Sequence, residues 1–232
     1  MTGAAPVPHT DPRSSLRFYL FHEVLKMEPY EYERWCYDST TPKVHDVRER
    51  PEDDPEKFGY WGKCRPWVPF VFWPPVIAVL AWWGGFALLP FVVGSLLWFP
   101  IERLFHQHLF HLKVRGPVTM KFHLMLHGVH HLATFDLNHI VSPPPELGLQ
   151  LLAVAFVLYL VRVPNVPMVC AALLVSYLRY DFVHWMVHRY QKKQLVQVPL
   201  VGGLLGRLKD QHMEHHFHDP QSNFVISFLS PF

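Results

Sequence analysis

The hydrophobic pattern of the chain is dominated by one stretch without charged residues, from Pro66 to Ile101. Its 36 positions exceed the roughly 20 apolar residues that one membrane-spanning helix needs, and Gly84-Gly85 interrupts it near its middle. The stretch predicts a tight helical hairpin, or one span followed by a re-entrant piece. Pro74, Pro75 and Pro90 are expected to kink these helices.

A second apolar region consists of two shorter parts. Residues 147–161 contain 15 uncharged positions and residues 163–178 contain 16. The segment between them is rich in turn-forming residues: Arg162, Pro164, Asn165 and Pro167. Each part is short for a full span unless its helix extends past the uncharged core. The pattern predicts a second hairpin that enters the bilayer, and a buried helical core of a soluble protein is the alternative.

These patterns together predict an all-α integral membrane protein, with about four transmembrane helices in two hairpins capped by a cytosolic, His-rich helical region. Residues 67–232 hold 11 basic and 7 acidic residues. Several of the basic residues follow the hairpins, and the positive-inside tendency makes that side and the N-terminus cytosolic. We expect a disordered segment at 1–14, a cytosolic segment at 15–65 with an amphipathic helix at 16–28, and a membrane domain at 66–232.

Composition supports a membrane protein and excludes some partners. Half of the residues are hydrophobic and 17% are charged, against about 25% charged in soluble domains. The net charge of +2 is too small to indicate nucleic-acid binding. Cys36, Cys64 and Cys170 form no CxxC pair and are odd in number, which predicts buried thiols rather than disulfides. No cleavable signal peptide is expected, because no apolar stretch follows a basic N-terminal region.

The candidate chemistry lies in the histidines. Of 17 in the chain, 14 occur at or after position 106, just beyond the apolar segments. HGVHH at 127–131 and HMEHH at 212–216 repeat one pattern, and two looser pairs accompany them. The four groups comprise His106 and His111; His127, His130 and His131; His184 and His188; and His212, His215 and His216.

Helical geometry places most of these imidazoles on common faces. With about 100° per residue, each triplet spans an arc of roughly 100°, and His184 lies about 40° from His188. His106 and His111 fit less well, at about 140° apart on an α-helix. By helix geometry alone, His108 would be the better partner of His111.

So many imidazoles are more easily explained as metal ligands than as core residues, because packing them together would bury many polar nitrogens. Ten nitrogens exceed one octahedron, which predicts two ions. Imidazole suits zinc, copper, iron and nickel alike, so the ligands alone do not select the metal. Carboxylates near the groups are expected to accept hydrogen bonds from the second ring nitrogens: Glu102, Asp136, Asp181 and Asp210.

The order HxxxxH (106–111), HxxHH (127–131), HxxxH (184–188) and HxxHH (212–216) resembles the membrane fatty acid hydroxylase superfamily, most closely its fatty acid 2-hydroxylases of the plant type. The stretches IERLFHQHLFHL, LMLHGVHHLATFDLNHIVSPP, YDFVHWMVH and LKDQHMEHHF carry the resemblance, and YEYERWCY at 30–37 adds to it. Asn223 and Val225 stand where the family usually has glycines, and His139 stands where it usually has arginine.

This resemblance implies that all ten histidines named above bind metal, with His106 rather than His108 as a ligand. It implies a di-iron, dioxygen-dependent enzyme of the endoplasmic reticulum membrane, in which zinc can occupy the sites of isolated protein. The implied reaction is hydroxylation at carbon 2 of the acyl chain of ceramide or of a fatty acid. No HPGG haem motif occurs here, so electrons are expected from a separate cytochrome b5 and its reductase. The alternatives are a related hydroxylase of sterols or other lipids, a desaturase, or an inactive metal-binding relative.

Overall fold

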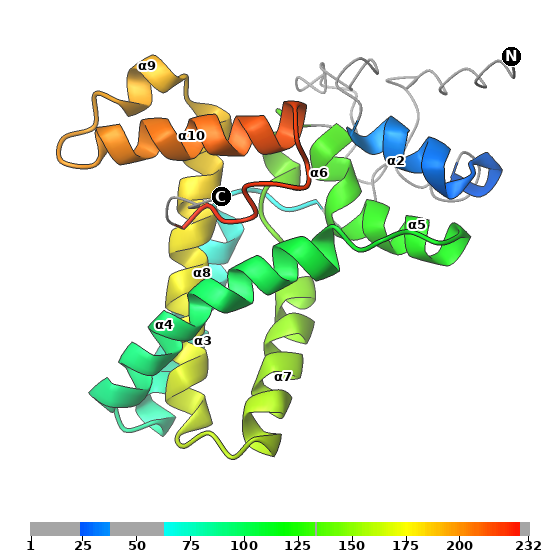
Figure 1. Cartoon of the computed structure of the whole chain (residues 1–232). Helices are drawn as coiled ribbons and strands as arrows, with labels where there is room; N and C mark the ends of the chain where they lie inside the picture. Colours follow the sequence, from blue (N-terminus) through cyan, green and yellow to red (C-terminus); the bar gives the residue numbers. More distant parts are fainter. Residues whose placement is uncertain (1–23, 38–62, 133, 228–232) are drawn as a thin grey trace, which may run out of the picture.

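The computed structural model describes residues 24–37, 63–132 and 134–227, and every regular element in that part of the chain is helical. Figure 1 shows long helices that extend away from a layer of helices at one end of the molecule. The elements are η2 (Val24–Lys26), α2 (Pro29–Tyr37), α3 (Val68–Trp83), α4 (Leu88–Leu104), η3 (Phe105–Phe110), α5 (Pro117–His123), η4 (Leu124–Gly128), α6 (Val129–Leu132), η5 (Leu137–His139), α7 (Pro144–Leu160), α8 (Val166–Arg189), α9 (Lys192–Leu195) and α10 (Gly202–Phe217).

The first apolar stretch forms a helical hairpin of α3 and α4, as its pattern predicts. The turn occurs where Gly84-Gly85 interrupts the sequence, and Gly85 adopts a positive φ of 62° that a side chain would disfavour. Pro90 lies in the first turn of α4, where a missing backbone N–H removes no helical hydrogen bond. Pro74 and Pro75 lie inside α3.

The second apolar region forms the hairpin of α7 and α8, and both helices extend past their uncharged cores. Asn165 ends the turn with a φ of 55°, and its side chain accepts a hydrogen bond from the Met168 backbone N–H. The Asn165 amide also donates to the carbonyl oxygen of Gly84 at 2.9 Å. One polar side chain therefore joins the tips of the two hairpins.

Helix α8 is the centre of the bundle and packs against α3, α4 and α7. Gly94 on α4 allows the closest approach, because a Cβ there would lie 2.6 Å from the Val169 carbonyl oxygen and 2.7 Å from the Ala172 Cβ. The opposite faces carry exposed apolar side chains, including Trp82, Leu88 and Leu152. Such a surface is compatible with lipid and costly in water.

Three helical segments are long and apolar enough to cross a membrane: Leu88–Phe110, Leu137–Leu160 and Val166–Arg189. Helix α3 is apolar but has 16 residues, a length of about 24 Å. The chain is therefore a multi-pass membrane protein, and the full crossing of a fourth helix stays a prediction.

The shorter helices lie at one end of the bundle, and α10 crosses the end of α8 there (Figure 1). The predicted helix at 16–28 falls mostly outside the described residues, as does the predicted disordered segment at 1–14. For the described end of the predicted helix the prediction is wrong, because Val24–Lys26 is a 3-10 turn and the α-helix begins at Pro29. Proline disfavours a helical conformation in the residue before it and is well suited to the first helical position. The domain boundaries stay predictions.

Candidate metal centre

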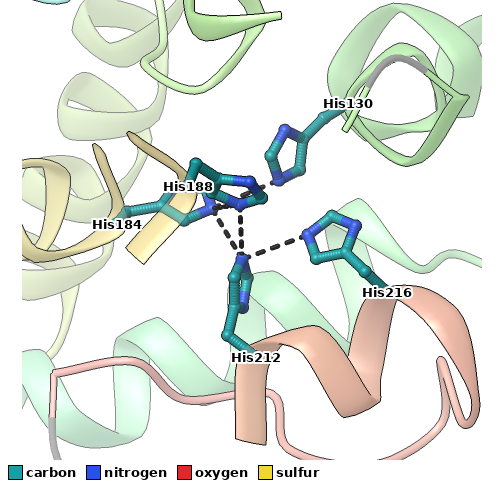
Figure 2. Close-up of side chains that lie close together, drawn as sticks. All are labelled: His130, His184, His188, His212 and His216. Carbon is teal, nitrogen blue, oxygen red and sulfur yellow. Dashed lines mark hydrogen bonds between the residues drawn. The ribbon is translucent and has the colours of Figure 1, made fainter. Parts of the chain in front are cut away.

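Five buried histidines converge at the junction of three helices. His130 comes from α6, His184 and His188 from α8, and His212 and His216 from α10. One donor atom of each lies within 4.8 Å of the others, and Figure 2 shows the rings pointing toward one another. We call these residues the five-histidine group.

Four further histidines form a second cluster, the four-histidine group, which contains His106, His111, His127 and His215. Its members also lie within 4.8 Å of one another and are buried. His131 lies between the two groups. Its Nε2 is 3.2 Å from the Nε2 of His111, and its ring centroid is 4.4 Å from that of His216. The structure thus brings all ten predicted histidines together.

The nitrogen spacing fits bound cations. The Nε2 atom of His184 lies 3.0 Å from that of His212 and 3.2 Å from those of His130 and His188. A neutral imidazole nitrogen carries either one proton or one lone pair, so hydrogen bonds satisfy at most one of these contacts. Nitrogens bound at about 2.1 Å and at right angles around one ion would be about 3.0 Å apart. The donor set therefore suits a metal ion in each group.

Local helix geometry explains how distant positions join one face. Helices α8 and α10 present their histidines by ordinary α-helical spacing. His106 lies in η3, a π-helical segment, and the His111 N–H donates to the His106 carbonyl at 3.0 Å across five residues. A turn closed by this i→i+5 bond places residues five apart on one side. The separation of about 140° between His106 and His111 that an α-helix would give therefore does not apply, because this segment is π-helical.

Burial keeps these imidazoles neutral. Desolvation lowers the pKa of His127, His130 and His212 well below the usual histidine value, and neighbouring imidazoles lower it further. Neutral imidazole is the form that binds metal. The same environment makes a metal-free cluster of charged rings unfavourable.

The second ring nitrogens of several of these histidines contact backbone carbonyls and a tyrosine hydroxyl. His106 Nδ1 lies 2.9 Å from the Phe224 carbonyl oxygen, and His215 Nδ1 lies 2.7 Å from that of Ser222. His111 Nδ1 lies 3.1 Å from the Tyr37 hydroxyl. Such partners fix the ring orientation and leave Nε2 free to bind.

Three of the four predicted carboxylates have partners other than the ten histidines among the described residues. Asp136 accepts from His139 at 2.8 Å, and Asp210 forms an exposed ion pair with Lys192. Glu102 accepts from the backbone of the C-terminal segment instead of from an imidazole. Direct support of ligands by Asp136 and Asp210 is therefore wrong. Backbone carbonyls, which no sequence pattern marks, take part of that role.

Glu102 acts on the site through that C-terminal segment. Its Oε1 accepts from the N–H groups of Ile226 and Ser227 at 2.7 and 3.0 Å. The same segment supplies the Phe224 and Ser222 carbonyls that contact the rings of His106 and His215. Asn223 adopts a φ of 55°, a conformation that favours glycine and that asparagine tolerates better than most residues. The departure from the family pattern at this position therefore keeps the required turn.

A cavity lined mainly by apolar side chains adjoins both histidine groups. It runs between α4, α7 and α8 and reaches His106, His127, His130 and His184 at one end. Farther along the helices its lining includes Leu151, Val154, Leu173 and Leu174. Asp181, Tyr177 and Gln150 contribute polar atoms to its wall. Among the described residues, neither Asp181 oxygen has a partner at hydrogen-bonding geometry.

Two functional features were missed by the sequence reasoning. His123 is a buried histidine beside the centre that was not assigned to any group, although it precedes His127 by one helical turn. The cavity could not be located, because helix packing decides which apolar residues face it. Cys36, Cys64 and Cys170 are free and buried, as predicted.

The comparisons with known proteins agree with this geometry. The family model described as fatty acid hydroxylase matches residues 91–230. The chain is 33% identical to the fatty acid 2-hydroxylase of Rattus norvegicus over 143 residues, covering 59% of this chain and 36% of that protein. It is 27% identical to a dihydroceramide fatty acyl 2-hydroxylase of Arabidopsis thaliana, covering 72% of this chain and 68% of that one.

A solved structure has a similar fold. Full-length scs7p, of which only the hydroxylase domain is visible, matches with a TM-score of 0.61 and 25% identity, covering 73% of this chain and 69% of that one. The chain spans about a third of the length of the rat relative. The matched region includes most of α4, all of α8 and α10, and all ten histidines. The chain belongs to the fatty acid hydroxylase family.

Proposed function

We propose that this chain is a dimetal monooxygenase of membrane lipids that hydroxylates carbon 2 of the fatty acyl chain of ceramide or dihydroceramide. The observation that carries the proposal is the contact between the apolar cavity and both histidine groups. An acyl chain in that cavity would place its polar end against the imidazoles. Relatives named as fatty acid and dihydroceramide fatty acyl 2-hydroxylases support the same reaction.

The ten histidines would hold two ions, one in each group with His131 between them, and iron is the expected metal in the cell. The bound metal supplies the activation of dioxygen that cleavage of an unactivated C–H bond needs. Overall, the acyl CH₂ group, O₂, two electrons and two protons give a CHOH group and water. The protein contributes neutral ligands, a dry cavity and the position of the acyl chain.

The polar atoms in the cavity favour an amide-linked acyl chain over a free fatty acid. Asp181 lies in the wall near His184, with Glu146 and Gln150 on α7 also lining the cavity. These carboxyl groups and the Gln150 amide can exchange hydrogen bonds with the amide and hydroxyl groups of a ceramide, whereas a free fatty acid would have to bury a charged carboxylate in this wall. We therefore propose ceramide or dihydroceramide as the substrate.

The electrons are proposed to come from a separate cytochrome b5 and its reductase, because the reaction consumes two per turnover. We place the protein in the endoplasmic reticulum membrane, with the histidine groups and the N-terminus on the cytosolic side. The basic residues in and near α5, α9 and α10, such as Lys113, Lys121 and Lys193, support this orientation by the positive-inside tendency.

The direct test is lipid analysis of cells that express the chain. We expect 2-hydroxylated acyl chains in ceramides, and their loss in His130→Ala and His215→Ala, which remove one ligand from each group. Full activity in either variant would refute the site assignment. A hydroxylated sterol or a new double bond would instead show a different reaction of the same centre. Absence of any product with reduced cytochrome b5 and dioxygen would indicate an inactive relative.

A further inference from the structure

A hydrogen-bonded chain of aromatic side chains connects the N-terminal helix to the metal centre. The Tyr32 hydroxyl lies 2.7 Å from His123 Nδ1, and the other ring nitrogen of His123 lies 2.5 Å from the Tyr37 hydroxyl. Tyr37 then reaches His111 Nδ1 at 3.1 Å. Tyr37 also stacks on the His111 ring, with centroids 5.3 Å apart, and contacts the His131 ring edge-on at 5.0 Å.

The direction of each hydrogen bond follows from the role of His111. As a ligand through Nε2, His111 must carry its proton on Nδ1 and donate to the Tyr37 oxygen. Tyr37 then donates to His123 Nε2, which leaves the His123 proton on Nδ1 for donation to Tyr32. The direction of all three hydrogen bonds is then fixed, and every side chain in the chain is neutral. Burial, which lowers the pKa of His123 to about 4, is consistent with a neutral ring.

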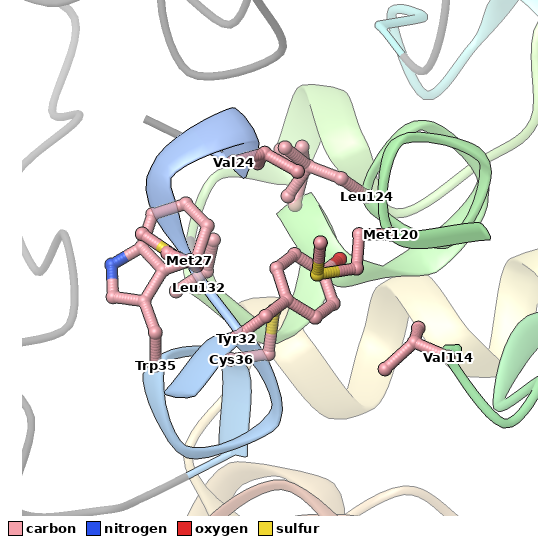
Figure 3. Packing of buried hydrophobic residues seen from close by; sticks show 10 residues of the cluster. Val24, Met27, Tyr32, Trp35, Cys36, Val114, Met120, Leu124 and Leu132 are labelled. Carbon is pink, nitrogen blue, oxygen red and sulfur yellow. The ribbon is translucent and has the colours of Figure 1, made fainter. Parts of the chain in front are cut away.

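The packing around the chain leaves little freedom. Tyr32 and His123 are 0% and 1% exposed, and Tyr32 packs with Met120 and Leu124 in the cluster of Figure 3. Gly128, the glycine of HGVHH, passes so close that a Cβ would lie 3.0 Å from both the His123 Nδ1 and the Tyr32 hydroxyl. The glycine in the histidine triplet is thereby explained by this contact.

A second cavity lies beside the hydrogen-bonded chain. This cavity, of about 270 Å³, is lined by Tyr32, Tyr37, His111 and His123 together with Glu33 and Lys113. A cavity of this size and polarity accommodates water. Loss of the Tyr37 hydroxyl would leave the Nδ1 of a ligand facing it.

We propose that Tyr37 is a positioning residue for the metal ligand His111 and that His123, braced by Tyr32, fixes the Tyr37 hydroxyl. Helix α2 thereby forms part of the metal centre although it supplies no ligand. Outer partners of this kind typically change metal affinity by about 10–100-fold when removed. The role concerns metal binding and is independent of which lipid is hydroxylated.

Binding of Co²⁺ to the full-length protein in detergent tests the proposal, with competition by a chelator for affinity and visible absorption for ligand geometry. We expect Tyr37→Phe, which keeps the ring, to weaken the binding of one Co²⁺ by about 10–100-fold and to alter its spectrum. Tyr30→Phe is the matched control, since Tyr30 lies on the same helix and is 68% exposed. Identical affinity and spectrum in the two variants would overturn the proposal.

A double-mutant cycle with His123→Gln separates positioning from general stability. If His123 acts through Tyr37, adding His123→Gln to Tyr37→Phe weakens Co²⁺ binding little beyond the single variant. Fully additive losses would overturn the role of His123. No lipid or dioxygen is present, so the network can stand even if 2-hydroxylation is refuted. Failure of the unmodified protein to bind Co²⁺ would overturn both this proposal and the proposed metal centre.

Discussion

The backbone N–H of His111 donates to the carbonyl oxygen of His106 at 3.0 Å, and this bond spans five residues instead of four. The π-helical segment that it closes brings two proposed ligands to one side of the chain. His108 lies within the same segment but does not belong to either histidine group. One extra residue in a helical turn therefore decides which histidine pairs with His111.

Lengthening this segment should remove one metal site. Insertion of one alanine after His108 would place the two histidines six positions apart, a spacing that puts them on different sides of an α-helix, so we expect loss of about one of the two proposed ions. His108→Ala, which keeps the length, should retain both. Metal content of the purified variants measures this. Equal metal content in the two variants would show that the five-residue spacing of His106 and His111 is not required.

Removal of the Glu102 carboxylate should loosen the C-terminal segment. Glu102→Ala leaves the N–H groups of Ile226 and Ser227 without their acceptor, at a cost of about 1–3 kcal/mol for each buried donor. The carbonyls that hold His106 and His215 would then lose their position, and metal retention should fall. Glu102→Gln keeps one acceptor oxygen and should be milder. The resistance of bound metal to a chelator ranks the two variants. An equal loss in both would show that one acceptor oxygen at position 102 does not hold the C-terminal segment.

Close packing at Gly94 should make even one methyl group costly. Gly94→Ala would press a Cβ against the Val169 carbonyl and separate α4 from α8, with an expected destabilisation of about 1–3 kcal/mol. Gly203→Ala is the control, because no atom lies within 4 Å of a Cβ at that helical position. Alanine there should stabilise by about 0.5–1 kcal/mol. Thermal unfolding in detergent compares them, and a Gly94→Ala protein as stable as the wild type would contradict the packing.

Obstruction of the cavity should change the acyl chain length that is accepted. Val154 lines the cavity, whereas Val157 on the same helix is 56% exposed. We expect Val154→Phe to shift 2-hydroxylated products toward shorter chains, because the added ring occupies space away from the histidines. Val157→Phe should leave the distribution unchanged. Mass spectrometry of ceramides provides the comparison, and an unchanged distribution in Val154→Phe would place the acyl chain elsewhere.

The hairpins were accessible to sequence reasoning because their signals are local. An uncharged stretch interrupted at Gly84-Gly85 can bury its backbone polar groups in lipid only by forming helices, and the break marks the turn. The second hairpin was predicted from the turn residues around Asn165. The link from Asn165 to Gly84 was not predictable, because it joins residues 81 positions apart.

The histidines show the same division. Their number and spacing predicted a metal centre, since so many imidazoles are unfavourable in a core without a cation, but His106 was preferred to His108 only because of the family resemblance. Their distribution between a five-histidine and a four-histidine group was decided only by the crossing of α8 and α10. The partners of their second nitrogens, such as Tyr37 and the Phe224 carbonyl, were also decided there. Helical periodicity acts over a few residues, whereas the approach of distant backbone and hydroxyl groups depends on how whole helices pack.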